Sequence, residues 1–213
     1  MAGKYNFGNN PNKLLDEVLA FNSEEGYAKL LDIIITKMME ITFSDAGTLY
    51  ILDEGKLHFR ILKNKSLGIS KIVGSGDADE LPPVVLDENN IDNVCAYCAI
   101  HNEIIIIEDV YEDQQFNFQG PKNYDKMTGY RTRSMLVLPL LSDWEGEQEL
   151  LGVIQLLNST NPETGEPMSY NDIYNSSVEI TLSHIAANTL ANLTHMREIH
   201  QLQRYLRVGT GSR

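Results

Sequence analysis

The sequence contains only two cysteines, Cys95 and Cys98, among its 213 residues. A four-ligand zinc site would need a second cysteine pair, and none of the five histidines stands at a matching spacing. In a cytosolic chain both thiols are expected to be reduced. Residues three apart on a helix share one face, so we expect the two thiols to be buried packing groups. We expect no metal and no cofactor. The alternative is a reactive thiol pair, serving a redox sensor or an enzyme.

Long apolar segments are also missing. The longest purely aliphatic run is Ile104–Ile107, which is far too short to cross a bilayer. The first eight residues, Met-Ala-Gly-Lys-Tyr-Asn-Phe-Gly, lack the apolar stretch of a signal peptide. We therefore expect a cytoplasmic protein that does not enter a membrane.

Basic residues are scarce, with 17 lysines and arginines against 30 aspartates and glutamates, so the formal net charge is −13. A surface this acidic repels phosphate backbones and anionic lipid headgroups. Nucleic acid is therefore not an expected partner.

Catalytic signatures are absent as well. The sequence has no G-x-S-x-G, no H-E-x-x-H and no phosphate-binding G-x-x-x-x-G-K-[ST] motif. We therefore expect a domain that is not an enzyme.

Hydrophobic residues make up 42% of the chain, which is enough for a folded core. Alternating and apolar runs predict strands, listed here by residue number: 48–52, 56–62, 104–107, 134–140 and 150–157. Helices are expected over 91–101 and from about 169 to 206, with an irregular segment over 109–130 and an acidic turn over 142–149. The predicted fold is α/β (α+β), a six-stranded and mostly antiparallel sheet flanked by helices, with long N- and C-terminal helices.

Three parts of the chain are expected. Residues 1–22 form an N-terminal arm with a short helix, 23–195 form the main domain, and 196–213 form a C-terminal signalling helix or linker with a tail. Apolar residues recur at steps of three and four along the last helix: Leu182, Ile185, Thr189, Leu193, Met196, Ile199, Leu202 and Leu206. This seam predicts a homodimer through the terminal helices.

Three polar residues before the strand at 134–140 are spaced so that their side chains could lie close together. Asp125, Thr128 and Thr132 are three and seven residues apart, and a helical turn over 123–129 would place the first two on one face. One carboxylate and two hydroxyls could then bind a polar small molecule. Local capping by the same side chains is the alternative.

The segment that follows is the most specific in the chain. Residues 129–140 read Gly-Tyr-Arg-Thr-Arg-Ser-Met-Leu-Val-Leu-Pro-Leu, and residues 151–158 read Leu-Gly-Val-Ile-Gln-Leu-Leu-Asn. With Ile-Glu-Asp-Val-Tyr-Glu-Asp over 107–113, this succession resembles a GAF domain of the branch found in cyclic-nucleotide phosphodiesterases and bacterial signalling proteins. The resemblance implies a regulatory domain of a bacterial signal-transduction protein. Such a domain binds a small molecule and acts on a C-terminal output domain.

The resemblance also implies roles for individual residues. Asp125, Thr128 and Thr132 would contact a purine or its surroundings, and the backbone of Val94 and Cys95 would face a phosphate. The strand positions that match base-side contacts are Thr48, Leu62 and Gln155.

Several positions depart from the cyclic-nucleotide branch. That branch tends to have an aromatic–acid pair where this chain has Leu62–Lys63, and a glutamate where Gln155 stands. We therefore expect no tight binding of cyclic GMP or cyclic AMP. A pure dimerisation module with a collapsed pocket remains a further alternative, and its mark would be a core filled by Leu62, Tyr97 and Met127.

Overall fold

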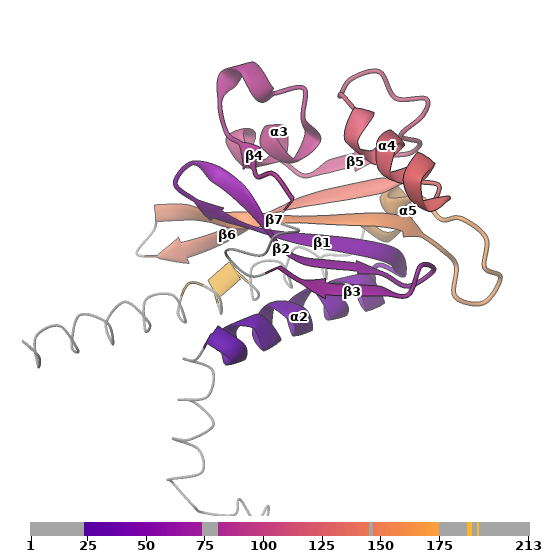
Figure 1. The fold of residues 1–213 in the computed structure, drawn as a ribbon, viewed down its shortest axis with the longest axis horizontal. Helices are drawn as coiled ribbons and strands as arrows, with labels where there is room; N and C mark the ends of the chain where they lie inside the picture. Colours follow the sequence, from indigo (N-terminus) through magenta and orange to yellow (C-terminus); the bar gives the residue numbers. More distant parts are fainter. Residues whose placement is uncertain (1–23, 74–80, 145–146, 175–186, 189–190, 192–213) are drawn as a thin grey trace, which may run out of the picture.

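The computed structural model describes residues 24–73, 81–144, 147–174, 187–188 and 191 (Figure 1). They form a seven-stranded sheet in which every strand pair is antiparallel, with the order β3-β2-β1-β7-β6-β5 and β4 paired to β2. The strands are β1 Ser44–Asp53, β2 Lys56–Asn64, β3 Ile69–Ile72, β4 Val84–Val85, β5 Ile105–Ile107, β6 Met135–Trp144 and β7 Glu147–Ser159. The helices are α2 Glu24–Ile41, the short 3₁₀ turn η1 Glu88–Asn90, α3 Val94–His101, α4 Gln119–Thr128 and α5 Tyr170–Tyr174.

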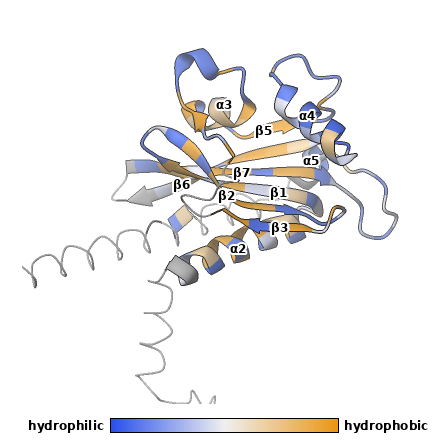
Figure 2. Cartoon of the chain, viewed as in Figure 1, coloured by the Kyte–Doolittle hydropathy of each residue, from blue (hydrophilic) through white to orange (hydrophobic). Residues whose placement is uncertain are grey.

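The sheet separates two hydrophobic cores. Helix α2 covers one face, while α3 and α4 lie over the other (Figure 1). Leu31, Ile35 and Leu49 are among the residues buried on the α2 face, and Tyr50 and Cys98 belong to the core beneath α3. Figure 2 shows the apolar residues concentrated along the central strands, with hydrophilic loops around α3 and α4. The predicted α/β class with an antiparallel sheet is confirmed.

Three details differ from the prediction. The sheet has seven strands instead of six, because the two-residue β4 pairs with β2. The segment predicted as an acidic turn is mostly strand, since Ser142↔Glu149 and Asp143↔Gln148 continue the β6–β7 ladder. The segment 109–130, predicted to be irregular, contains α4, whose proline at position 121 is compatible with a first helical turn.

Two glycines let neighbouring elements come close to the sheet backbone, Gly47 under α2 and Gly152 beside β1. A Cβ on Gly47 would lie 2.9 Å from Ile35 Cδ1 and 3.0 Å from the Met39 side chain, so α2 rests directly on the backbone of β1. A Cβ on Gly152 would lie 2.1 Å from the carbonyl oxygen of Tyr50, far inside van der Waals contact. At Gly152 the neighbour is backbone, so a larger residue requires the backbone to move. At Gly47 the neighbours are the side-chain ends of Ile35 and Met39, which would have to shift.

The short helix predicted within residues 1–22 and all eight residues of the apolar seam from Leu182 to Leu206 lie outside the described residues. Of that seam region the structure describes 187–188 and 191, and Ala187 and Ala191 are buried. No helix among the described residues is long and apolar enough to span a membrane.

Candidate functional site

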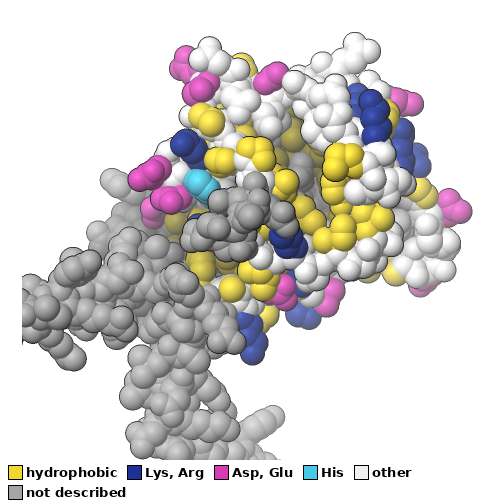
Figure 3. All heavy atoms as spheres, in the orientation of Figure 1, with side chains coloured by type: hydrophobic (Ala, Val, Ile, Leu, Met, Phe, Trp, Pro, Cys, Tyr) yellow, Lys and Arg dark blue, Asp and Glu magenta, His cyan; other side chains and the backbone are white. Residues whose placement is uncertain are grey.

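A cavity of about 330 Å³ lies between the sheet and the layer made by α3 and α4. Strands β1, β2, β6 and β7 supply its floor, and α3, α4 and the chain around Pro82 supply its walls. On this face of the molecule, hydrophobic side chains surround a hollow (Figure 3). Its size falls at the lower end of the range for small-molecule pockets, roughly 300–1,000 Å³.

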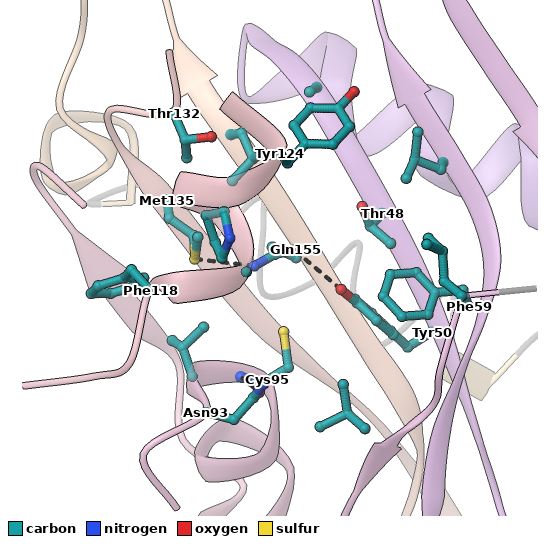
Figure 4. Close-up of a pocket in the computed structure, with 18 of the residues that line it drawn as sticks. Thr48, Tyr50, Phe59, Asn93, Cys95, Phe118, Tyr124, Thr132, Met135 and Gln155 are labelled. Carbon is teal, nitrogen blue, oxygen red and sulfur yellow. Dashed lines mark hydrogen bonds between the residues drawn. The ribbon is translucent and has the colours of Figure 1, made fainter. Parts of the chain in front are cut away.

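Aromatic and sulfur-containing side chains form much of the cavity wall. The rings of Tyr50 and Phe59 lie 4.5 Å apart between centroids, and Phe118 and Met135 face them across the cavity (Figure 4). A register shift at Leu49/Tyr50 pairs Thr48 with Leu62 and Tyr50 with Phe59. This irregularity allows Phe59 and Leu62, three residues apart, to line the same cavity.

Gln155 lies at the centre of the floor, opposite Thr48 in the β1–β7 register. Its Nε2 donates to Met135 Sδ at 3.2 Å, and its Oε1 accepts a long bond of 3.3 Å from the Tyr50 hydroxyl (Figure 4). Thioether sulfur is a weak acceptor, so the amide is only partly satisfied by the protein.

The first turn of α3 reaches the cavity through Val94 and Cys95. Asn93 caps this helix, because its Oδ1 accepts from Cys95 N at 3.0 Å and from Ala96 N at 3.1 Å. The side chain thereby satisfies two of the amides that a helix start leaves unpaired.

Asp125 is buried in α4 and holds the start of β6. Thr132 donates its backbone N–H to Asp125 Oδ2 and its hydroxyl to Oδ1, each at 2.8 Å, and the Tyr111 hydroxyl donates to Oδ2 at 2.9 Å. The bond to Asp125 raises the pKa of the Tyr111 phenol. The Arg131 guanidinium lies 3.6 Å from the centre of the Tyr111 ring. These contacts fix the lid, defined here as residues 109–130, to the sheet.

Thr128 has a local role at the end of α4. Its hydroxyl donates to the carbonyl of Tyr124 at 2.8 Å and accepts from the backbone N–H of Tyr130 at 3.2 Å. Gly129 follows in the left-handed conformation that commonly ends a helix. The capping interpretation of Thr128 therefore describes its contacts in this structure.

Of the eight residues predicted for the site, the structure brings six to the cavity: Thr48, Leu62, Val94, Cys95, Thr132 and Gln155. Asp125 and Thr128 are not among the lining residues, although Asp125 bonds directly to one of them. Contact with a ligand stays a prediction for all eight.

Sequence reasoning missed sixteen of the 22 lining residues, among them Tyr50, Phe59, Asn93, Phe118 and Tyr124. Strand alternation could have found Tyr50, because it shares a face with Thr48. Asn93 has the residue type and position of a helix cap.

Both cysteines are free and buried. Burial raises the pKa of the Cys95 thiol to about 12 and also raises the pKa of the Cys98 thiol. At neutral pH both are protonated, which is the unreactive form. Among the described residues, no group of three His, Cys, Asp or Glu side chains could hold a metal ion.

The mark proposed for a collapsed pocket is not observed. The Met127 side chain is 84% exposed, and Leu62 lines the open cavity without filling it. Tyr97 packs against His101 and Phe116, with ring centroids 4.3 and 5.3 Å away.

The chain is similar in sequence to a family of domains and to several curated proteins. A sequence profile described as "GAF domain" matches residues 27–190. The chain is 33% identical over 79 residues to dual 3′,5′-cyclic-AMP and -GMP phosphodiesterase 11A of Takifugu rubripes, covering 37% of this chain and 8% of that protein. It is 26% identical over 139 residues to probable 3′,5′-cyclic phosphodiesterase pde-5 of Caenorhabditis elegans, covering 60% and 17%. The chain thus spans less than a fifth of the length of these curated relatives.

Among solved structures, the GAF domain/HD domain protein from Geobacter sulfurreducens superposes with a TM-score of 0.50. The two sequences are 9% identical, and the superposition covers 85% of this chain and 98% of the other. At that identity the likeness concerns the fold alone.

Proposed function

The chain belongs to the GAF domain family, and from that premise we propose that it is a ligand-sensing regulatory domain and not an enzyme. A small molecule binds in the cavity between the sheet and the α3–α4 layer. The terminal helices then pass the change to an output domain that follows in a bacterial signal-transduction protein. The curated relatives above are animal phosphodiesterases, so the bacterial setting and the output domain rest on the sequence resemblance.

One observation carries this proposal: an open, mostly apolar cavity with incompletely satisfied polar groups. The Gln155 amide has one weak and one long bond, and the Tyr124 hydroxyl is shielded from solvent without a hydrogen-bond partner among the described residues. Buried polar groups without partners are costly, and a ligand can supply those partners.

The lid could link ligand binding in the cavity to the position of α4 and the start of β6. Asp125 ties α4 to the start of β6, while Tyr124 and Pro121 of the same helix line the cavity. A ligand that contacts these two residues favours one position of α4, and it can shift the protein only by binding one arrangement more tightly than another.

We also propose that the domain works as a homodimer through its terminal helices. The support is the apolar seam from Leu182 to Leu206 in the sequence, since a solitary helix would expose that stripe to water. Analytical ultracentrifugation should show a dimer at tens of micromolar, roughly the range expected for a standard interface. Exclusively monomeric protein at that concentration would contradict the dimer.

The thiol-based alternative has less support. Cys95 and Cys98 are buried and their pKa values are raised, whereas reactive thiols have lowered pKa values and are accessible.

The test of ligand binding is native mass spectrometry of the purified full chain, combined with thermal-shift screening of soluble metabolites. Ala46→Leu adds bulk at a lining position, and Met127→Ala is the control at an exposed position outside the lining. We expect a retained or stabilising molecule in the wild type and Met127→Ala, and its loss in a folded Ala46→Leu. If no compound binds the wild type, or if Ala46→Leu binds it equally well, the proposed function fails.

A further inference from the structure

Among the described residues, the cavity lining presents no charged group to the interior, and this property selects among ligands. We propose that it binds an uncharged, flat, ring-containing molecule and discriminates against anions, cyclic nucleotides included. This inference rests on the proposed function, because it assumes that the cavity is a ligand site.

Lys63 is the one charged residue among the described residues that line the cavity. Its ammonium group lies on the opposite face of the sheet, where Nζ contacts Asp32 Oδ1 and Thr36 Oγ1 of α2, each at 2.7 Å. The polar side chains around the cavity in the described part of the chain are hydroxyls and amides. An anion would therefore leave water without meeting a counter-charge, which is strongly unfavourable in an apolar site.

The start of α3 does not replace the missing cation. A helix start binds anions through unpaired backbone N–H groups, aided by the helix dipole. Here the N–H groups of Cys95 and Ala96 already donate to Asn93 Oδ1. A ligand phosphate or carboxylate would have to displace that side chain to reach them. With a net charge of −13, the chain as a whole also repels anions.

The shape and surface of the cavity suit a flat ring. Tyr50 and Phe59 offer neighbouring aromatic rings, Phe118 lies across from them, and Cys95 and Met135 contribute sulfur atoms (Figure 4). Aromatic rings and thioethers both make favourable contacts with ring systems. A volume of about 330 Å³ admits a one- or two-ring compound more readily than a large ligand.

Two polar groups are placed to orient such a ring. The Gln155 amide can exchange its weak bond to Met135 Sδ for a stronger one to a ligand acceptor. The Tyr124 hydroxyl can act as donor or acceptor, and it has no partner among the described residues. A neutral heterocycle or carboxamide supplies matching donors and acceptors without bringing charge.

Matched pairs of probes test the inference on the full chain. Nicotinamide with nicotinate, and indole-3-carboxamide with indole-3-carboxylate, keep the ring and change the charge, and guanosine with cyclic GMP adds a nucleotide pair. Affinities are measured by calorimetry and ligand-observed NMR for the wild type, Gln155→Leu, Tyr124→Phe and the exposed control Met127→Ala. We expect at least one neutral probe to bind, and to bind at least tenfold more tightly than its anionic partner. Gln155→Leu should weaken that neutral probe about tenfold, and Met127→Ala should leave it unchanged.

Equal or tighter binding of the anion in any pair would overturn the inference, and it would leave the ligand-sensing function standing. Binding of the neutral probe that is unaffected by both Gln155→Leu and Tyr124→Phe would also overturn it. If no neutral probe binds at millimolar concentration, the inference is wrong. If the metabolite screen is empty as well, the proposed function fails with it.

Discussion

Replacing Asp125 by alanine tests whether this carboxylate serves the lid or a ligand directly. The change removes the acceptor of three bonds, two from Thr132 at 2.8 Å and one from Tyr111 at 2.9 Å. Thr132 is only 1% exposed, so its backbone N–H would be left buried without a partner. A stranded buried donor costs about 1–3 kcal/mol. The Thr132 hydroxyl adds about 1 kcal/mol, whereas the half-exposed Tyr111 can bond to water, so we expect a total of about 2–4 kcal/mol.

The measurement is urea unfolding followed by circular dichroism, together with limited proteolysis of the lid. Asp125→Ala should lower the free energy of unfolding and speed cleavage within 109–130. Tyr111→Phe is the graded control, since it removes one of the three bonds and should cost about 1 kcal/mol or less. An Asp125→Ala protein within about 0.5 kcal/mol of the wild type, with unchanged cleavage, would refute the lid-anchor reasoning. The carboxylate would then be free to serve the ligand directly.

Two further perturbations test the sheet and the thiols. Gly152→Ala should cost more than about 4 kcal/mol of stability, because its Cβ would lie 2.1 Å from the Tyr50 carbonyl oxygen. Gly120→Ala, which has nothing within 4 Å of the new Cβ, should instead stabilise α4 by up to about 1 kcal/mol. If the two variants unfolded at similar urea midpoints, both expectations would be wrong. Since burial raises the pKa of Cys95 from 9.0 to about 12, the folded state keeps a proton that the unfolded chain loses. Its contribution to stability is therefore complete below pH 9 and declines as the pH rises toward 12. The free energy of unfolding, measured at pH 7.5, 9 and 10.5, should fall less steeply with pH for Cys95→Ala than for the wild type. An equal fall in the two proteins would rule the effect out.

The central strands were predictable, because the alternation of apolar and polar residues and the segments that resemble a GAF domain both indicate strands there. The expectation that Thr48 and Gln155 share a site agrees with their direct pairing in the β1–β7 register. The far end of the β6–β7 hairpin was not predictable from apolar pattern. There the ladder continues through Asp143↔Gln148, and a polar residue can extend a strand wherever it reaches solvent.

The spacing of Asp125 and Thr132 predicted that they would converge, and they do. Spacing could not reveal that the two residues bond to each other, because a carboxylate accepts equally well from a ligand or from a backbone N–H. Tyr111 gave no signal, since it lies 14 residues from Asp125 and only the folded lid brings it close. The Tyr50–Phe59 contact likewise depends on a register shift, which no local pattern announces.

The glycine at position 47 has a mechanical consequence. Strand β1 carries Thr48 on the cavity side, and at the neighbouring residue its bare backbone meets Ile35 and Met39 of α2. At Gly47 the contact joins the strand backbone to the side-chain ends of Ile35 and Met39, so these two side chains set the spacing between β1 and α2. We therefore expect a ligand that displaces Thr48 to move the backbone at Gly47 against these two side chains. A small movement at the cavity would then reach the helix on the other face of the sheet through one layer of side chains.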